Sequence, residues 1–213
     1  MDFNYFINQV SKIENLPLPG EQVHIEMAPI ERLIEIKNSV LAKNTAKRAG
    51  VVALFYPDAL SVVKIALILR KSSKGVHSGQ VGFPGGRAEQ FDTSILDTAL
   101  RETEEEIGVI RDHIQIIKQL TEIYIPPSNF LVQPFMGFVT ETPQFLLQEE
   151  EVESLIEVSL DHFLSDSIQI TKTLSTSYAN NINVPAFYLN NHVVWGATAM
   201  MLNEIRHLLK KMV

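Results

Sequence analysis

Three glutamates near the middle of the chain are the residues best suited to chemistry. Glu102, Glu105 and Glu106 lie in the run Arg101–Gly108. On a helix that turns by about 100° per residue, Glu102 and Glu106 are i and i+4 neighbours, and Glu105 flanks both. Carboxylate oxygens are the ligands of hard divalent cations, and Mg²⁺ is usually held by one or two carboxylates together with substrate phosphate. The spacing therefore predicts a cation site on a helix.

This clustering has an energetic cost that needs a reason. Like charges at i and i+4 destabilise a helix by about 0.2–0.5 kcal/mol per pair, and Arg101 offsets only part of this by pairing with Glu105. The simplest alternative is a solvated glutamate-rich helix face. The residues on either side of the helix decide between the two interpretations.

The helix that carries the glutamates is predicted over residues 94–107. Asp92, Thr93 and Ser94 offer N-cap groups, and Gly108 is a suitable stop. The side opposite the glutamates is mostly apolar and should face the core. Its residues are Leu96, Leu100, Thr103 and Ile107.

A glycine-rich loop precedes this helix. Residues 71–92 are rich in Gly, Ser and Lys and include Gly82-Phe83-Pro84-Gly85-Gly86, where the backbone can approach a ligand closely. Before the loop, residues 50–57 and 61–70 are apolar and β-branched, with a Pro57-Asp58 turn between them, which predicts a hairpin of buried strands.

The remaining elements favour a mixed sheet with helices. Strands are expected at 114–125, 131–140 and 185–195, and helices at 3–14, 28–43 and 196–211, while residues 151–164 are mixed. Strands and helices alternate without a regular βαβ rhythm, so a mixed sheet is expected rather than a doubly wound parallel one.

Bulk properties narrow the function. The 213 residues carry a formal net charge of −7, which argues against a broad nucleic-acid footprint. No cysteine is present, which excludes thiolate nucleophiles and zinc–thiolate sites. Neither a signal peptide nor a run of 18 apolar residues is found, so no membrane association and a cytoplasmic enzyme are expected.

The spacing Gly86-x5-Asp92-x8-Arg101-Glu102-Thr103-x-Glu105-Glu106-x-Gly108 resembles the Nudix box. Asp92 stands where the family usually has Glu, and one extra residue separates it from Arg101. The resemblance implies an α/β/α sandwich with a mixed sheet. It also implies a Nudix hydrolase domain over 46–213, with residues 1–45 as an added helical segment packed on the core.

A second resemblance is to the coenzyme A pyrophosphatase group of Nudix hydrolases. Leu67, Arg70, Gly79 and the run Phe83–Gly86 match a signature that precedes the box in this group. The segments His77–Gln80 and Val194–Ala199 are also similar. Gly75 stands where the group has a second arginine.

These resemblances imply roles for particular residues. Glu102, Glu105 and Glu106 would hold Mg²⁺ or Mn²⁺, with Glu105 as third ligand or water activator and Arg101 orienting a glutamate. Glu151 is the candidate general base. Arg70 and the Gly85–Gly86 backbone would bind substrate phosphates. A homodimer is also expected.

The expected reaction is hydrolysis of coenzyme A or acyl-coenzyme A to 3′,5′-ADP and (acyl-)4′-phosphopantetheine. Gly75 keeps open the same chemistry on ADP-ribose, NADH or a dinucleoside polyphosphate. A non-catalytic Nudix-like binding module is the third possibility, but it would be expected to have lost metal ligands, and all three glutamates are present.

Overall fold

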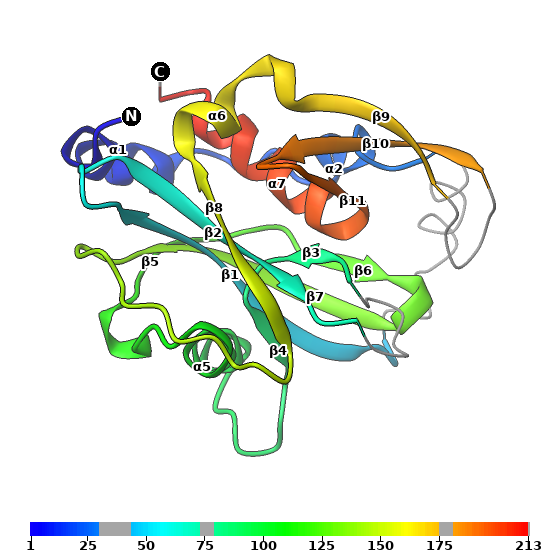
Figure 1. Ribbon diagram of the computed structural model, residues 1–213. Helices are drawn as coiled ribbons and strands as arrows, with labels where there is room; N and C mark the ends of the chain where they lie inside the picture. Colours follow the sequence, from blue (N-terminus) through cyan, green and yellow to red (C-terminus); the bar gives the residue numbers. More distant parts are fainter. Residues whose placement is uncertain (30–43, 73–78, 175–180, 213) are drawn as a thin grey trace.

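The computed structural model describes residues 1–29, 44–72, 79–174 and 181–212. Its centre is an eight-stranded mixed sheet, and a smaller three-stranded sheet lies near the carboxy-terminal helix (Figure 1). Helices cover both faces of the large sheet, which confirms the predicted sandwich. No helix in these ranges is long and apolar enough to cross a membrane.

The large sheet is built around β1 (Lys47–Pro57), which runs parallel to β7 (Phe130–Phe138). All other strand pairs are antiparallel. The remaining strands of this sheet are β2 (Val63–Arg70), β3 (Val81–Gly82), β4 (Gly85–Arg87), β5 (Gln115–Gln119), β6 (Ile123–Ile125) and β8 (Val152–Ser159).

β1 and β2 pair over only part of their lengths. Residues 54–57 of β1 pair with residues 63–66 of β2, as the predicted hairpin requires. Beyond that, β1 pairs with β4 at residues 49–51, and β2 pairs with β3 at residues 68–69. The glycine-rich segment therefore sits where the two long strands separate.

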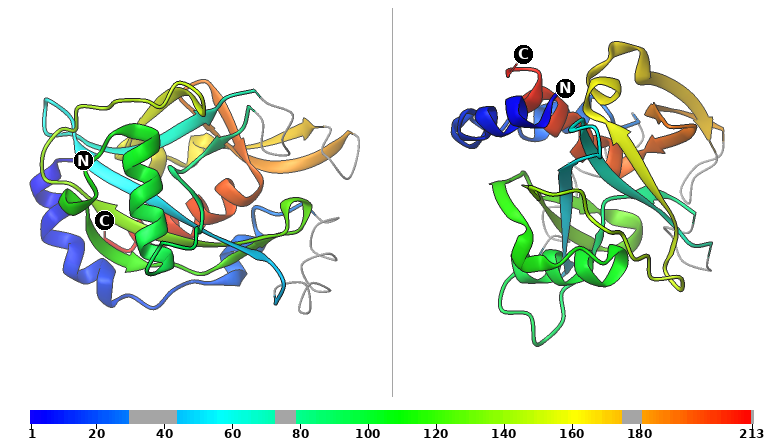
Figure 2. Two further views of the ribbon diagram at one scale, coloured as in Figure 1. Left: turned by 90° about the horizontal axis from the view of Figure 1, so that it is seen from below. Right: turned by 60° about the vertical axis from the view of Figure 1, so that its left-hand side comes forward.

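Successive side chains of β1 point to opposite faces of the sheet, so the core forms two layers. Val51, Ala53 and Phe55 belong to one buried cluster, which includes residues of α1 (Phe3–Asn15) and α7 (Gly196–Leu209). Val52, Leu54 and Tyr56 of β1 belong to the cluster under α5 (Ile95–Ile107). Figure 2 shows α5 on one side of the sheet and α1 and α7 on the other. A strand buried on both faces explains the continuous apolar run in its sequence.

Several predicted boundaries were wrong. The expected strand 114–125 is two strands, β5 and β6. The expected strand 185–195 is a hairpin of β10 (Ile182–Leu189) and β11 (His192–Trp195), because Asn190 and Asn191 both adopt positive φ, as a tight two-residue turn requires. β9 (Gln169–Leu174) completes the small sheet and was not expected.

Other expectations were closer. The mixed segment 151–164 is strand β8 followed by α6 (Leu160–Leu164). Most of the helix expected at 28–43 lies outside the described residues, and the described amino-terminal part contains α1 and α2 (Glu21–Ile25). Within the described ranges, three short 3₁₀ helices lie at Arg111–His113, Pro126–Ser128 and Asp166–Ile168.

A buried carboxylate ties the amino-terminal segment to α7. Glu204 is fully buried and accepts hydrogen bonds from the Gly20 N–H at 3.2 Å and the Thr121 hydroxyl at 2.6 Å. The His24 ring lies 3.1 Å from the same carboxylate. Burial by itself disfavours the charge, but the bonds with His24 and Thr121 outweigh it and lower the pKa of Glu204.

Glu204→Gln is expected to lower the free energy of unfolding by about 2–4 kcal/mol at pH 7, because buried donors lose a charged acceptor. A depressed folded pKa stabilises the fold above the unfolded pKa, and that contribution is lost as the pH falls through the folded value. The difference from wild type should therefore shrink below about pH 4. Urea unfolding at pH 7 and at about pH 3 measures the difference. If the exposed control Glu14→Gln lowered the free energy of unfolding by the same amount, the stabilising role of Glu204 would be contradicted.

Candidate active site

Capping fixes where α5 begins and ends. The Ser94 hydroxyl accepts a hydrogen bond from the Asp97 N–H at 3.1 Å. At the other end Gly108 has a φ of +74°, a left-handed conformation that favours glycine. The segment between β7 and β8 also binds this end of the helix, since the Gln148 N–H donates to the Glu106 carbonyl at 3.0 Å. The last turn, which carries Glu105 and Glu106, is therefore held in place by the chain on both sides.

Gly50 allows α5 to lie unusually close to β1. A Cβ atom at Gly50 would be 2.4 Å from the Ile95 carbonyl oxygen and 2.9 Å from the Ala99 Cβ. The sequence reasoning did not single out this residue. Its only signal was a glycine inside an otherwise apolar strand, which often marks a close approach of backbone.

The Glu102 carboxylate lies in close contact with the glycine loop at Gly86. A Cβ atom at Gly86 would be 2.1 Å from one carboxylate oxygen of Glu102, so only glycine leaves room for this carboxylate. Gly86 pairs with Gly50 across β4 and β1. The two glycines therefore place both the helix and its first glutamate against the sheet.

Glu106 is almost completely buried, with 1% of its side chain exposed. One oxygen accepts a hydrogen bond from the Gly85 N–H at 2.8 Å. Arg70 Nη1 lies 3.0 Å from the other oxygen, Oε1, close enough for an ion pair but without hydrogen-bond alignment, so Oε1 has no hydrogen-bond partner. Arg70 Nη2 instead donates to the Gly85 carbonyl at 2.7 Å.

The electrostatics of these two glutamates favour a cation. Burial raises the pKa of Glu106 to about 7, with Arg70 and the Gly85 N–H opposing the rise and Glu102 and Glu151 adding to it. Burial also raises the pKa of Glu102, against the influence of Arg101. A positive ion beside both carboxylates would relieve this unfavourable burial of charge.

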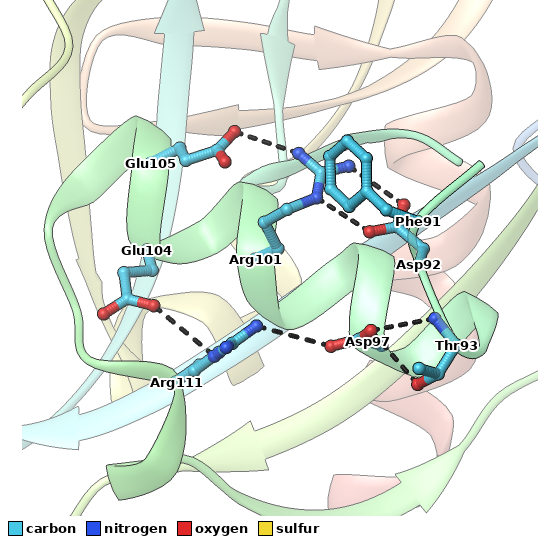
Figure 3. Close-up of a pocket in the computed structure, with 8 residues that line it drawn as sticks. All are labelled: Phe91, Asp92, Thr93, Asp97, Arg101, Glu104, Glu105 and Arg111. Atoms are coloured by element: carbon cyan, nitrogen blue, oxygen red, sulfur yellow. Dashed lines mark hydrogen bonds and ion pairs between the residues drawn. The ribbon is translucent and has the colours of Figure 1, made fainter. Parts of the chain in front are cut away.

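Arg101 is the centre of a charge network on the outer side of the helix. It binds Asp92 through two contacts of 2.8 and 3.0 Å, Glu102 at 2.8 Å and Glu105 at 2.9 Å. Figure 3 shows Arg101 between Asp92 and Glu105. Arg101 lowers the pKa of Asp92, and the Thr98 hydroxyl also donates to that carboxylate. Arg101 and Asp92 pair although the box that this sequence resembles usually has Glu at this position, and although one extra residue separates Asp92 from Arg101.

Glu105 is the most exposed of the three glutamates, and it shares the Arg101 Nη1 donor with Glu102. Its side chain is 53% exposed and lies at a hollow of about 630 Å³ on the outer side of α5 (Figure 3). This hollow does not include Glu102 or Glu106. The residues that line it are Phe91, Asp92, Thr93, Asp97, Arg101, Glu104, Glu105 and Arg111.

The predicted base Glu151 lies in the turn immediately before β8. It is exposed, and its carbonyl accepts a hydrogen bond from the Lys71 N–H at 2.8 Å, next to Arg70. Its charge contributes to the raised pKa of both Glu102 and Glu106. The fold thus brings Glu151 into electrostatic range of the two buried glutamates.

The residues fit a cation whose coordination is completed by a ligand. Among the described residues, no three acidic or histidine side chains form a complete metal-binding group. Glu106 nevertheless presents a buried oxygen without a hydrogen-bond partner, and Glu102 lies on the adjacent glycine. Mg²⁺ commonly takes one or two carboxylates and draws its other ligands from water and substrate phosphate. Glu102 and Glu106 would hold such an ion.

The sequence matches a known domain family and curated relatives. The model of the NUDIX domain family matches residues 45–173. A protein named "Uncharacterized Nudix hydrolase NudL" from Pectobacterium atrosepticum is 31% identical over 66% of this chain and 72% of its own. A protein of the same name from Yersinia pestis (strain Pestoides F) is 35% identical over 62% of this chain and 64% of its own.

Two solved structures share the fold. A Nudix hydrolase from M. smegmatis, RenU, has a TM-score of 0.53 at 14% identity, covering 78% of this chain and 87% of its own. A MutT/nudix family protein from Enterococcus faecalis has a TM-score of 0.52 at 15% identity, covering 92% and 76%. This chain belongs to the Nudix family and is a Nudix hydrolase.

Proposed function

We propose that this Nudix hydrolase uses Mg²⁺ or Mn²⁺ to cleave the pyrophosphate of coenzyme A or acyl-coenzyme A. The products would be 3′,5′-ADP and (acyl-)4′-phosphopantetheine. The observation that carries the metal-dependent reaction is the buried Oε1 of Glu106, which lacks a hydrogen-bond partner beside Glu102 and Gly86. We also propose a cytoplasmic homodimer, and light scattering of the purified protein tests the dimer.

Glu102 and Glu106 are the first two proposed metal ligands. Glu105 is the proposed third ligand or water activator, and it pairs with Arg101, which would orient a glutamate. When bound, the cation would neutralise pyrophosphate oxygens and favour attack by water. Glu151 is the proposed general base, a role that its proximity to Glu102 and Glu106 supports.

Arg70 is the proposed contact to a substrate phosphate. Its side chain is 30% exposed and bridges Glu106 and the Gly85 carbonyl, so it borders the same space as the metal ligands. A guanidinium held in this way offers further N–H groups to an anionic oxygen. The Gly85–Gly86 backbone would carry the loop beneath the phosphates.

The coenzyme A preference rests on the similarity of Leu67, Arg70, Gly79 and Phe83–Gly86 to the coenzyme A pyrophosphatase signature. One substitution favours a second candidate. Gly75, outside the described residues, replaces an arginine of that signature, which supports ADP-ribose, NADH or a dinucleoside polyphosphate as the alternative substrate.

Direct comparison of substrates tests the proposal. With Mn²⁺ or Mg²⁺, coenzyme A is expected to show a kcat/KM at least about tenfold above that of ADP-ribose, a difference of ~1.4 kcal/mol in transition-state binding. Mass spectrometry should identify 3′,5′-ADP and 4′-phosphopantetheine. Much faster turnover of ADP-ribose, or products cut elsewhere in the molecule, would reject coenzyme A as the substrate.

A further inference from the structure

The segment Val194–Ala199 lies beyond the residues that the family model matches, yet it reaches the active-site strands. β11 ends at Trp195 and packs against β3. Gly196 adopts a φ of +64° at the start of α7, a conformation that side-chain-bearing residues rarely adopt. This turn directs the first residues of α7 towards β3.

Thr198 makes the contact. Its hydroxyl donates a hydrogen bond of 2.9 Å to the Val81 carbonyl, 117 residues earlier in the chain. β3 contains only two residues, and within the described ranges the sheet pairs it with β2 alone. A two-residue strand has few bonds of its own, so a bond from a long, well-packed helix fixes its position.

β3 in turn touches Arg70 at two places. The Arg70 N–H donates to the Gln80 carbonyl at 3.0 Å, which holds the Arg70 backbone against the start of β3. A Cβ atom at Gly82 would be 3.7 Å from Arg70 Nε, so the guanidinium lies alongside the end of the strand. A shift of β3 would therefore move the guanidinium that bridges Glu106 and Gly85.

We infer that Thr198 is a positioning residue, which holds β3 so that Arg70 faces the substrate phosphates. The carboxy-terminal helix is then part of the active-site architecture, although it contributes no atom to the metal ligands. The inference rests on the proposed role of Arg70 in substrate binding, and it does not depend on which pyrophosphate is cleaved.

Thr198→Val removes the hydroxyl and keeps the shape of the side chain. The loss of one hydrogen bond that positions Arg70 should raise KM about threefold to tenfold, with kcat within about twofold of wild type. Thr198→Ser retains a hydroxyl and should restore KM. Thr198→Ala must reproduce the increase, and it replaces Thr198→Val if that variant does not fold.

A matched control separates this role from general stability. The Thr173 hydroxyl on the exposed strand β9 donates to Asn183 at 2.8 Å, so Thr173→Val removes a comparable bond away from β3. Thr173→Val should leave KM unchanged. A wild-type KM in Thr198→Val and Thr198→Ala, or an equal increase in Thr173→Val, would overturn the inference.

A double mutant tests the route through Arg70. In an Arg70→Gln background, Thr198→Val should have no further effect on KM, because the group that it positions is absent. If the two substitutions had additive effects on the binding free energy, Thr198 would not act through Arg70. All measurements use the pyrophosphate that wild type cleaves best. Failure to cleave coenzyme A would reject the proposed substrate and still leave the Thr198 test decisive.

Discussion

Replacement of Glu106 by glutamine is expected to reduce kcat by about 10²–10³-fold while the protein stays folded. Glutamine keeps the shape of the side chain and an oxygen for the Gly85 N–H, but it removes the negative charge of the carboxylate whose Oε1 lacks a hydrogen-bond partner. Because burial disfavours the charged carboxylate, the neutral variant should unfold at the same temperature as wild type or higher. Steady-state rates with Mn²⁺ and a thermal scan measure both effects.

The adjacent part of the same helix offers a matched control. Glu104 has 41% of its side chain exposed, and its carboxylate lies 3.8 Å from Arg111 Nε. Glu104→Gln makes the same chemical change and should retain nearly full activity. If Glu106→Gln hydrolysed substrate at the wild-type rate, Glu106 would not be a metal ligand.

Alanine substitutions at Gly86 and Gly85 are expected to have different effects, the first on kcat and the second on the free energy of unfolding. Alanine at Gly86 would place a Cβ atom 2.1 Å from the Glu102 carboxylate, which is the end of a side chain and can move aside. A misplacement of about 1 Å in a catalytic group can cost 10²-fold in rate. Gly86→Ala is therefore expected to lose about 10²-fold in kcat with a small change in Tm.

Gly85→Ala should instead destabilise the fold. Gly85 has a φ of +141°, and its Cβ atom would be 2.3 Å from the Gly50 carbonyl oxygen, which is backbone and cannot move aside. Strain and overpacking together should cost about 3 kcal/mol in the free energy of unfolding. Urea unfolding and rate measurements on both variants check the contrast. A Gly86→Ala variant with wild-type kcat would contradict the proposed role of Glu102.

Local signals allowed much of the fold to be predicted. The capping residue Ser94, the stop at Gly108 and the apolar face of α5 act within a few residues, so the helix was predicted to within one residue at its start. The β1–β2 hairpin followed from two apolar runs and a turn. The strand breaks at 120–122 and 190–191 were missed. At 190–191 the reason is that asparagine in a left-handed conformation gives a weaker turn signal than glycine.

The arrangement of the site depended on long-range packing. Helical spacing grouped the three glutamates but did not show which of them faces the sheet. Gly50 and Gly86 decide this by letting α5 approach so closely that the Glu102 and Glu106 side chains are largely covered, while the Glu105 side chain stays 53% exposed. The contact of Arg70 with Glu106 joins residues 36 positions apart in sequence, so no local pattern could indicate it.

The sequence by itself determined the helix, its glutamates and the glycine loop, because propensity, capping and spacing act over short stretches of chain. Only the tertiary structure decided that one glutamate oxygen is buried without a hydrogen-bond partner, that Arg70 lies against it, and that Thr198 holds β3. Burial and distant contacts arise when separate elements pack together, and that packing sets the electrostatic environment in which a cation would bind.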